Sequence, residues 1–161
     1  MATHADHLLD AFEAAWTARD PSAFYDMCAS DVHYEDPFCA EPLEGPAAIG
    51  KHAERLWAGF PDVRADRSGE RLTDGRYVAA PLKLVGTNSG ELEGLPPTKR
   101  FVVVPVVLYC ELSVDGDELF RVRAFCDRYE AAMQLGLLPK PGTLGEKALL
   151  ALRGFGLSPR R

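Results

Sequence analysis

A carboxylate, Asp36, is the side chain whose position in this sequence most favours chemistry. It follows a short apolar strand pattern and, because side chains alternate faces along a strand, it shares a face with Val32 and Tyr34. If that face is buried, the acid must be paired or have a raised pKa, and a carboxylate against apolar walls is a common general base. Asp36 also precedes Pro37, so an equally good interpretation is that it caps a turn or begins the next helix.

Histidines are the other acid–base candidates. His33 lies on the strand face opposite Asp36, which favours a solvated or dimer-interface role. His52 flanks the apolar stripe of a helix, where a histidine is more often a satisfied neighbour of the core than a base. His4 and His7 have a spacing that suits a metal, but they fall at a terminus that we expect to fray. We therefore expect no metal site and no cofactor.

Apolar side chains could line a ligand pocket. Tyr109 follows the expected inward face of Pro105 and Val107, so its hydroxyl could reach a substrate oxygen, or it could be a sheet aromatic with a hydrated tip. The aromatic set suits a flat polycyclic or terpenoid ligand, although it would look the same in an ordinary core. Its members are Phe12, Trp16, Tyr34, Trp57, Phe60 and Phe101.

Composition and charge exclude several classes of protein. The chain has 161 residues, of which 47% are hydrophobic and 26% charged, as expected for one globular domain with a sizeable core. Its net charge of −6 and scattered basic residues argue against nucleic acid as a partner. No window approaches the apolar length of a membrane span, so we expect no membrane partner and a cytoplasmic location. The four cysteines lack metal or redox spacing and are expected to be small buried residues.

The order of the elements predicts an α+β fold, because helical patterns come first and strand patterns follow. A curved antiparallel sheet, joined by hairpin-length connections, should wrap over three N-terminal helices. The glycine-rich stretch 86–98 is too long for a tight turn and should form a loop near an opening. We expect a domain over 1–139 and a C-terminal helical extension over 140–161, which covers the pocket or a partner subunit, or packs outside the domain. The expected helices span 6–19, 21–29, 46–59 and 143–157, and the strands 32–35, 63–72, 77–87, 101–113 and 118–129.

From residue 8 to about 139 the sequence resembles the nuclear transport factor 2-like superfamily, which includes SnoaL-like polyketide cyclases, ketosteroid isomerases and limonene-type epoxide hydrolases. The Glu35-Asp36-Pro37 stretch is similar to the isomerase segment that carries the catalytic aspartate, which maps onto Asp36. The 86–98 loop and the segment 125–139 resemble SnoaL-like proteins instead. There an acid–base aspartate maps onto Asp127. The resemblance implies a cone-shaped sheet and homodimerisation through its outer face.

The departures from these families narrow the chemistry. Ketosteroid isomerases place oxyanion donors where Phe12 and Val107 stand here, and without them an enolate loses strong hydrogen bonds. The SnoaL-like loop commonly has a histidine at the position of Asn88. Period two places Asp127 on the charged face of the last strand, paired with Arg123 or Arg128, whereas the resemblance implies that a bulge or strand end turns it inward.

We expect a cofactor-independent enzyme resembling the SnoaL-like cyclases, acting on an apolar polyketide-like or polycyclic small molecule and driving its cyclisation or isomerisation. Asp36 or Asp127 would abstract a proton next to a carbonyl, and the other would serve as acid or orienter. A carbon activated by two carbonyls would tolerate the missing oxyanion donors. One alternative is an isomerase or an epoxide hydrolase in the same pocket. Arg123 and Asn88, which we expect to face the substrate, are weak matches to the arginine and asparagine that the hydrolase requires. The other is a non-catalytic binding module.

Overall fold

The computed structural model describes residues 3–153 of the chain. Helix α1 (His4–Ala18) begins with a capping box, in which the Thr3 hydroxyl accepts from the Asp6 amide and the Asp6 carboxylate accepts from the Thr3 amide. The helix ends at Arg19, whose left-handed backbone (φ 56°) lets its amide donate back into the last turn. Local chemistry therefore sets both ends of this helix.

Two short helical segments and one long helix complete the helical layer. The Asp20 carboxylate caps the first of them by accepting from the amide of Ser22 at 2.9 Å. Pro46 occupies the first turn of the long helix, where its missing amide hydrogen costs nothing. The three predicted N-terminal helices are thus present, with the second divided into a 3-10 turn and an α-helical turn: η1 (Pro21–Ala23), α2 (Phe24–Met27) and α3 (Pro46–Gly59).

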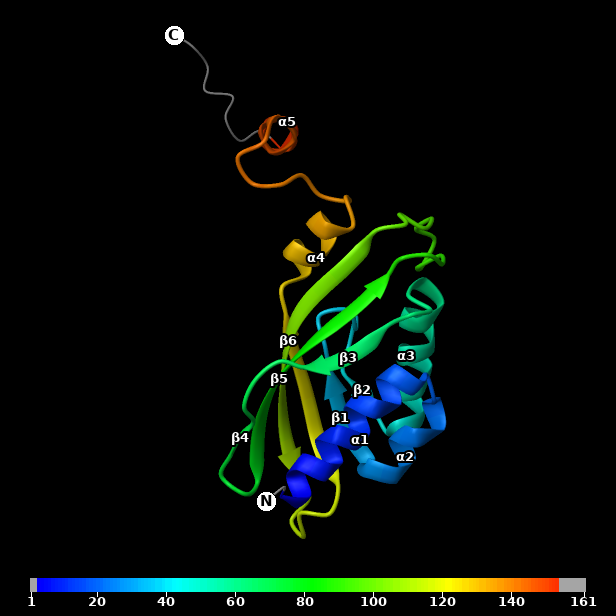
Figure 1. Cartoon of the computed structure of the whole chain (residues 1–161), viewed down its shortest axis with the longest axis vertical. Helices are drawn as coiled ribbons and strands as arrows, with labels where there is room; N and C mark the ends of the chain where they lie inside the picture. The colour runs from blue at the N-terminus through cyan, green and yellow to red at the C-terminus, as the bar shows by residue number, and fades with distance from the viewer. Residues whose placement is uncertain (1–2, 154–161) are drawn as a thin grey trace.

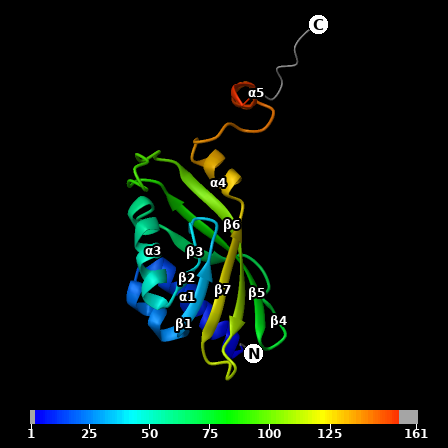
Figure 2. The ribbon, with the colours of Figure 1, turned by 180° about the vertical axis from the view of Figure 1, so that it is seen from behind.

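The sheet is curved and unclosed, and it wraps around the helices (Figures 1 and 2). Its order is β2-β1-β7-β6-β5-β3, with β4 paired to β5. The prediction of an antiparallel sheet holds for most neighbours, but β1 pairs in parallel with β7, so the sheet is mixed. Short connections indicate direction only for strands that follow one another, and these two are far apart in the chain. The strands are β1 (Cys28–Glu35), β2 (Leu43–Glu44), β3 (Arg64–Arg67), β4 (Leu72–Thr73), β5 (Tyr77–Thr87), β6 (Phe101–Leu112) and β7 (Leu119–Cys126).

The main core lies between α1–α3 and the concave face of the sheet. Phe12 and Phe24 pack edge to face there, with ring centroids 5.5 Å apart. The sheet contributes alternate residues of β6, so Val104, Val106 and Leu108 are buried. This core forms the walls within which the functional site lies.

Hydrogen bonds of the Asn88 side chain hold the loop between β5 and β6. The buried Asn88 side chain donates to the carbonyls of Gly59 and Gly90, each at 3.1 Å, and accepts from the amide of Thr98 at 2.8 Å. All of its hydrogen-bonding groups are thus engaged by the loop and by the end of α3, and Asn88 lines neither of the cavities described below. Its expected contact with substrate is therefore wrong: the amide holds the loop against the end of α3.

The chain beyond β7 forms two helices, α4 (Arg128–Gln134) and α5 (Leu144–Leu152). Helix α4 covers one end of β6, where the Gln134 side chain bonds both the amide and the carbonyl of Val103. Helix α5 lies beyond α4, at the end of the molecule away from α1 (Figure 1), and none of its residues is buried. Residues 154–157 of the predicted last helix lie outside the described part. None of the helices within residues 3–153 is long and apolar enough to span a lipid bilayer.

The turn at Gly90 predicts a sharp sensitivity to substitution. A Cβ atom at this position would meet the carbonyl oxygen of Ala58 at 1.8 Å, which no rotamer change can relieve. Gly90→Ala should lower the free energy of unfolding by about 1–3 kcal/mol, as expected for overpacking. Urea denaturation would measure this effect. Ser89→Ala, at an exposed neighbouring position, is the control and should change stability by less than about 0.5 kcal/mol; equal stabilities for the two variants would contradict the packing argument.

Candidate functional site

Two neighbouring cavities lie between the helices and the sheet. The first, which we call the Asp36 lobe, has a volume of about 40 Å³, and the second, the apolar lobe, about 100 Å³. Leu92 of the 86–98 loop and Leu135 after α4 contribute to the apolar lobe, so both segments close that end of the pocket. The two lobes share the side chains Trp16, Phe38, Leu56 and Leu84.

The Asp36 carboxylate ends the Asp36 lobe and accepts four hydrogen bonds. Oδ1 accepts from the backbone amides of Phe38 at 2.7 Å and Cys39 at 2.9 Å, so the residue does cap a turn. Oδ2 accepts from the Tyr34 hydroxyl and from Nε2 of His52, each at 2.7 Å. A carboxylate has about four lone-pair positions, so this one is saturated. The two interpretations of Asp36, turn cap and buried interior acid, therefore describe different oxygens of one side chain.

His52 is held in one tautomer by its second neighbour. The Arg55 guanidinium can only donate, and its Nη2 lies 3.0 Å from Nδ1 of His52, so Nδ1 must accept. The ring hydrogen is then on Nε2, where it points at Asp36. Arg55 also pairs with Glu93 of the 86–98 loop at 3.1 Å. His52 is only 3% exposed, so it is the satisfied core neighbour that the sequence favours, with Asp36 as the partner that the sequence did not indicate.

The hydrogen bonds set the protonation states of this cluster. Burial acts to raise the pKa of Asp36, but the bonds from His52, Tyr34 and the Phe38 amide outweigh it and hold the pKa below its ordinary value. Burial, together with the adjacent carboxylate, raises the pKa of the Tyr34 hydroxyl well above its usual range. The resting site is therefore an anionic carboxylate with a protonated tyrosine as donor. A buried acid must be paired or have a raised pKa, and Asp36 is paired.

The same place holds a set of metal-ligand types. A carboxylate oxygen of Asp36, Sγ of Cys39 and a ring nitrogen of His52 lie within 4.8 Å of one another. Their present chemistry does not suit a metal, because Nε2 carries the hydrogen and burial raises the pKa of the Cys39 thiol to about 12. A cation would have to displace both protons beside the positive charge of Arg55. The donor set fits hydrogen bonding better than coordination.

Most of the aromatic residues proposed from the sequence do lie around the pocket. Phe12 and Tyr34 line the Asp36 lobe, Phe60 lines the apolar lobe, and Trp16 lines both. Trp57 packs edge to face against Trp16, with ring centroids 5.9 Å apart, and lines neither lobe.

The proposed face of β6 is wrong. Phe101, Val107 and Tyr109 are 58%, 43% and 40% exposed and lie on the outer face of the sheet, where Tyr109 stacks on Tyr77. The residues that line the lobes are of the other parity, including Val106 and Leu108. Both faces of this strand are apolar in sequence, so alternation could not distinguish them.

Asp127 does not turn into the pocket. It is exposed and accepts from the amides of Tyr129 at 2.9 Å and Glu130 at 3.0 Å, which makes it the N-cap of α4. The strand ends one residue earlier, and the backbone continues into a helix that the sequence analysis missed. Arg123 pairs with Glu35 at 3.1 Å rather than with Asp127, so neither the inward prediction nor the surface ion pair describes this residue.

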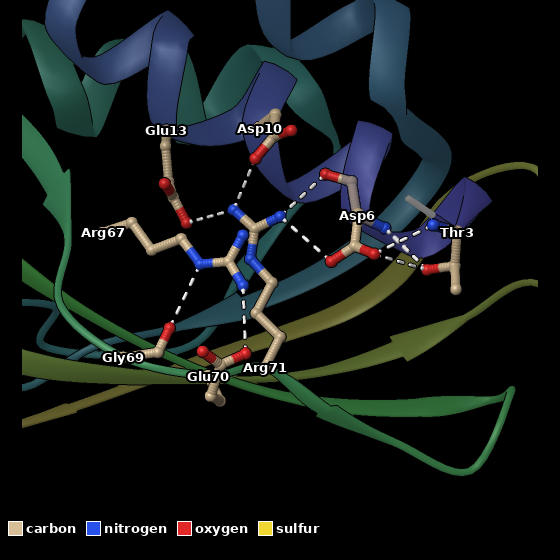
Figure 3. Close-up of polar contacts among 8 residues, drawn as sticks. All are labelled: Thr3, Asp6, Asp10, Glu13, Arg67, Gly69, Glu70 and Arg71. Atoms are coloured by element: carbon tan, nitrogen blue, oxygen red, sulfur yellow. Dashed lines mark hydrogen bonds and ion pairs between the residues drawn. The ribbon is translucent and has the colours of Figure 1, made fainter. Parts of the chain in front are cut away.

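A second carboxylate on the pocket wall was missed. Glu13 of α1 lines the Asp36 lobe and pairs through Oε1 with Nη2 of Arg71 at 2.8 Å. Figure 3 shows Arg71 between Glu13, Asp10 and Asp6, with the Asp10 carboxylate at 2.7 Å. The signal in the sequence is the position of Glu13 four residues after Leu9, inside the apolar stripe of the helix.

The lowered pKa of Asp36 predicts a pH dependence of stability. Since the folded-state pKa lies below the unfolded value of about 3.9, the ionised carboxylate stabilises the fold above about pH 4. That contribution is lost as the pH falls through the folded-state pKa. Asp36→Asn should lower the free energy of unfolding at pH 7 by about 2–4 kcal/mol, and the difference from wild type should shrink towards pH 3. Denaturation curves across this range, with the exposed Asp115→Asn as control, would measure it. A difference that does not vary with pH would contradict the assignment.

Comparison with solved structures places the fold among ketosteroid isomerase-like proteins. A hypothetical protein from Catenulispora acidiphila with that fold is 22% identical, with a TM-score of 0.67, covering 81% of this chain and 92% of its own. The proposed polyketide cyclase IdmH from Streptomyces antibioticus is 20% identical, with a TM-score of 0.71, covering 84% and 99%. The proposed hydroxylase AclR from Streptomyces galilaeus is 21% identical, with a TM-score of 0.73, covering 94% and 99%.

Curated proteins give no match to the sequence. The family model for SnoaL-like polyketide cyclase matches residues 6–135, which include most of α1, the whole sheet and α4. The match therefore contains both walls of the pocket and the Asp36 cluster. The chain belongs to the SnoaL-like polyketide cyclase family.

Proposed function

We propose that the protein is a cofactor-independent acid–base enzyme, which abstracts a proton next to a carbonyl of an apolar substrate and so drives cyclisation or isomerisation. The observation that carries the proposal is the pairing of Asp36 with the Tyr34 hydroxyl at the end of an apolar cavity. One group can take a proton and the other can donate a hydrogen bond to the oxygen on which charge develops. Membership of a cyclase family supports the reaction class.

The saturated state of Asp36 dictates the order of events. Proton abstraction needs a free lone pair, and of its four donors the Tyr34 hydroxyl is the one that can rotate towards a substrate. When a substrate carbonyl enters the lobe, Tyr34 donates to it and leaves Oδ2. The loss of that bond raises the basicity of Asp36, which His52 continues to orient.

The chemical step then balances within the pocket. The C–H bond next to the carbonyl breaks, an O–H bond forms on Asp36, and the electron pair moves to the carbonyl oxygen held by Tyr34. The enolate carbon then attacks an intramolecular carbonyl, whose oxygen takes the proton from Asp36, or the enolate is reprotonated at another carbon. Tyr34 supplies the oxyanion donor that the side chains of Phe12 and Val107 cannot.

The volumes of the two lobes limit the size of the substrate. Their volumes of about 40 and 100 Å³ are smaller than the roughly 300–1,000 Å³ of pockets for larger ligands, so small β-dicarbonyl compounds should fit best. A polycyclic substrate would require the segments around Leu92 and Leu135 to move outward.

The alternatives have weaker support. An epoxide hydrolase would need an arginine and a water-positioning asparagine in the pocket, but Arg123 is on the outer face and Asn88 is used by the loop. A binding module would use the same apolar walls without proton transfer.

Exposed Phe101, Val107 and Phe125 on the outer sheet face favour homodimerisation, which sedimentation velocity would test.

Hydrogen exchange in deuterated water tests the proposal. NMR would follow C–H exchange of acyclic and cyclic β-dicarbonyl compounds and of a 3-oxo steroid with wild type, Asp36→Asn and Tyr34→Phe. We expect exchange of the small compounds, a loss of at least about 100-fold in Asp36→Asn and of about 10-fold in Tyr34→Phe.

Asp127→Asn is the control for charge removal outside the pocket and should retain exchange within about threefold of wild type. Exchange that depends on Asp127 and not on Asp36 would contradict the assignment of the base. Binding of the compounds without exchange above the buffer rate would support the binding module instead.

A further inference from the structure

Glu13 is a buried carboxylate on the pocket wall that has no role in the proton transfer proposed for Asp36. Its side chain is 9% exposed, which is rare for glutamate unless the group is paired. It extends from α1, whereas Asp36 follows β1, so the two acids belong to different walls of the Asp36 lobe. Because this lobe is only about 40 Å³, a molecule that fills it contacts both walls.

The two oxygens of Glu13 have different surroundings. Oε1 accepts from Arg71, whose side chain is 3% exposed and is also held by Asp10 and by the backbone carbonyl of Asp6 (Figure 3). Within residues 3–153, Oε2 accepts no hydrogen bond. Arg71 thus fixes the carboxylate through one oxygen and leaves the other available to a ligand.

No other described side chain around the lobe offers a carboxylate oxygen that accepts no hydrogen bond. Asp36 is saturated in the resting state, and Asp127 lies outside as a helix cap. Burial raises the pKa of the Cys126 thiol to about 11, which keeps it neutral and makes it a poor base.

We propose that Glu13, through Oε2, is the second acid–base residue of this pocket and exchanges a proton with the substrate at a carbon or oxygen remote from the one that Asp36 deprotonates. The inference rests on the proposed function. In an isomerisation, Asp36 takes a proton from the α carbon to form the enolate. Glu13, whose Oε2 has taken up a proton from solvent while Oε1 keeps its bond from Arg71, then gives that proton to the γ carbon: its O–H bond breaks, a C–H bond forms, and the electron pair returns from the enolate oxygen. Proton transfer back from Asp36, through solvent, resets both acids.

Cyclohex-3-en-1-one separates the two proton transfers. Deuterium uptake at its α carbon reports the step at Asp36, and conversion to the conjugated isomer requires proton delivery at the γ carbon. In Glu13→Gln, which keeps an oxygen acceptor for Arg71, we expect α exchange within about threefold of wild type and conversion reduced by at least about 10-fold.

Asp10→Asn is the matched control, because Asp10 also pairs with Arg71 but is 58% exposed and lies outside the lobe. It should leave the ratio of conversion to exchange unchanged. If Glu13→Gln reduced neither rate, or reduced both by the same factor, the residue would be structural and the proposal wrong. The ratio is internal to each variant, so partial unfolding does not alter it.

A second readout applies if wild type neither exchanges nor converts this ketone, which would count against the proposed function rather than against Glu13. In protein labelled with ¹³C at the glutamate carboxyl, the Glu13 signal is assigned by its loss in Glu13→Gln. Saturation with 4-propylphenol, an enol mimic, should shift that signal in wild type and in Asp10→Asn. An unshifted signal, with nuclear Overhauser contacts showing the phenol beside Phe12, would overturn the contact with Glu13.

Discussion

The need to satisfy a buried carboxylate ties the structure around Asp36 together. Its four hydrogen bonds come from the end of β1, the following turn and helix α3, so a single side chain connects three parts of the chain. An unpaired charge at this depth would cost several kcal/mol, which is why the donors must stay in place while the pocket is empty. The same four hydrogen bonds therefore fix both the position of the Asp36 carboxylate and its ionised state.

This arrangement separates stability from reactivity. The resting carboxylate is stabilised and has a lowered pKa, and in the proposed mechanism it becomes a stronger base when a ligand draws the Tyr34 hydroxyl away. His52, fixed by Arg55, stays as the constant partner. On the other wall of the lobe, Arg71 holds one oxygen of the Glu13 carboxylate. Both acids are placed by buried ion pairs or hydrogen bonds rather than by apolar packing alone.

Sequence patterns predicted what depends on local chemistry. The helix expected over 46–59 has those bounds in the structure, and the position of Asp36 after an apolar strand pattern marked it as a candidate. The predictions that failed depend on contacts between elements that are far apart in the chain. The apolar residues on both faces of β6 could not show that Val106, rather than Val107, faces the pocket. The contact of His52 with Asp36 needs the packing of α3 against β1, and the parallel pairing of β1 with β7 has no local signal. The inward placement of Asp127 rested on the family resemblance, and the short helix that this residue caps was not predicted.

The most direct measurement is a crystal structure with 4-propylphenol bound, because the central claim is that a ligand oxygen takes the Tyr34 hydroxyl from Asp36. The account predicts the phenol oxygen within hydrogen-bonding distance of Tyr34, a lengthened Tyr34–Asp36 contact and an unchanged His52–Asp36 bond. A phenol oxygen remote from Tyr34, with the 2.7 Å Tyr34–Asp36 bond intact, would contradict it.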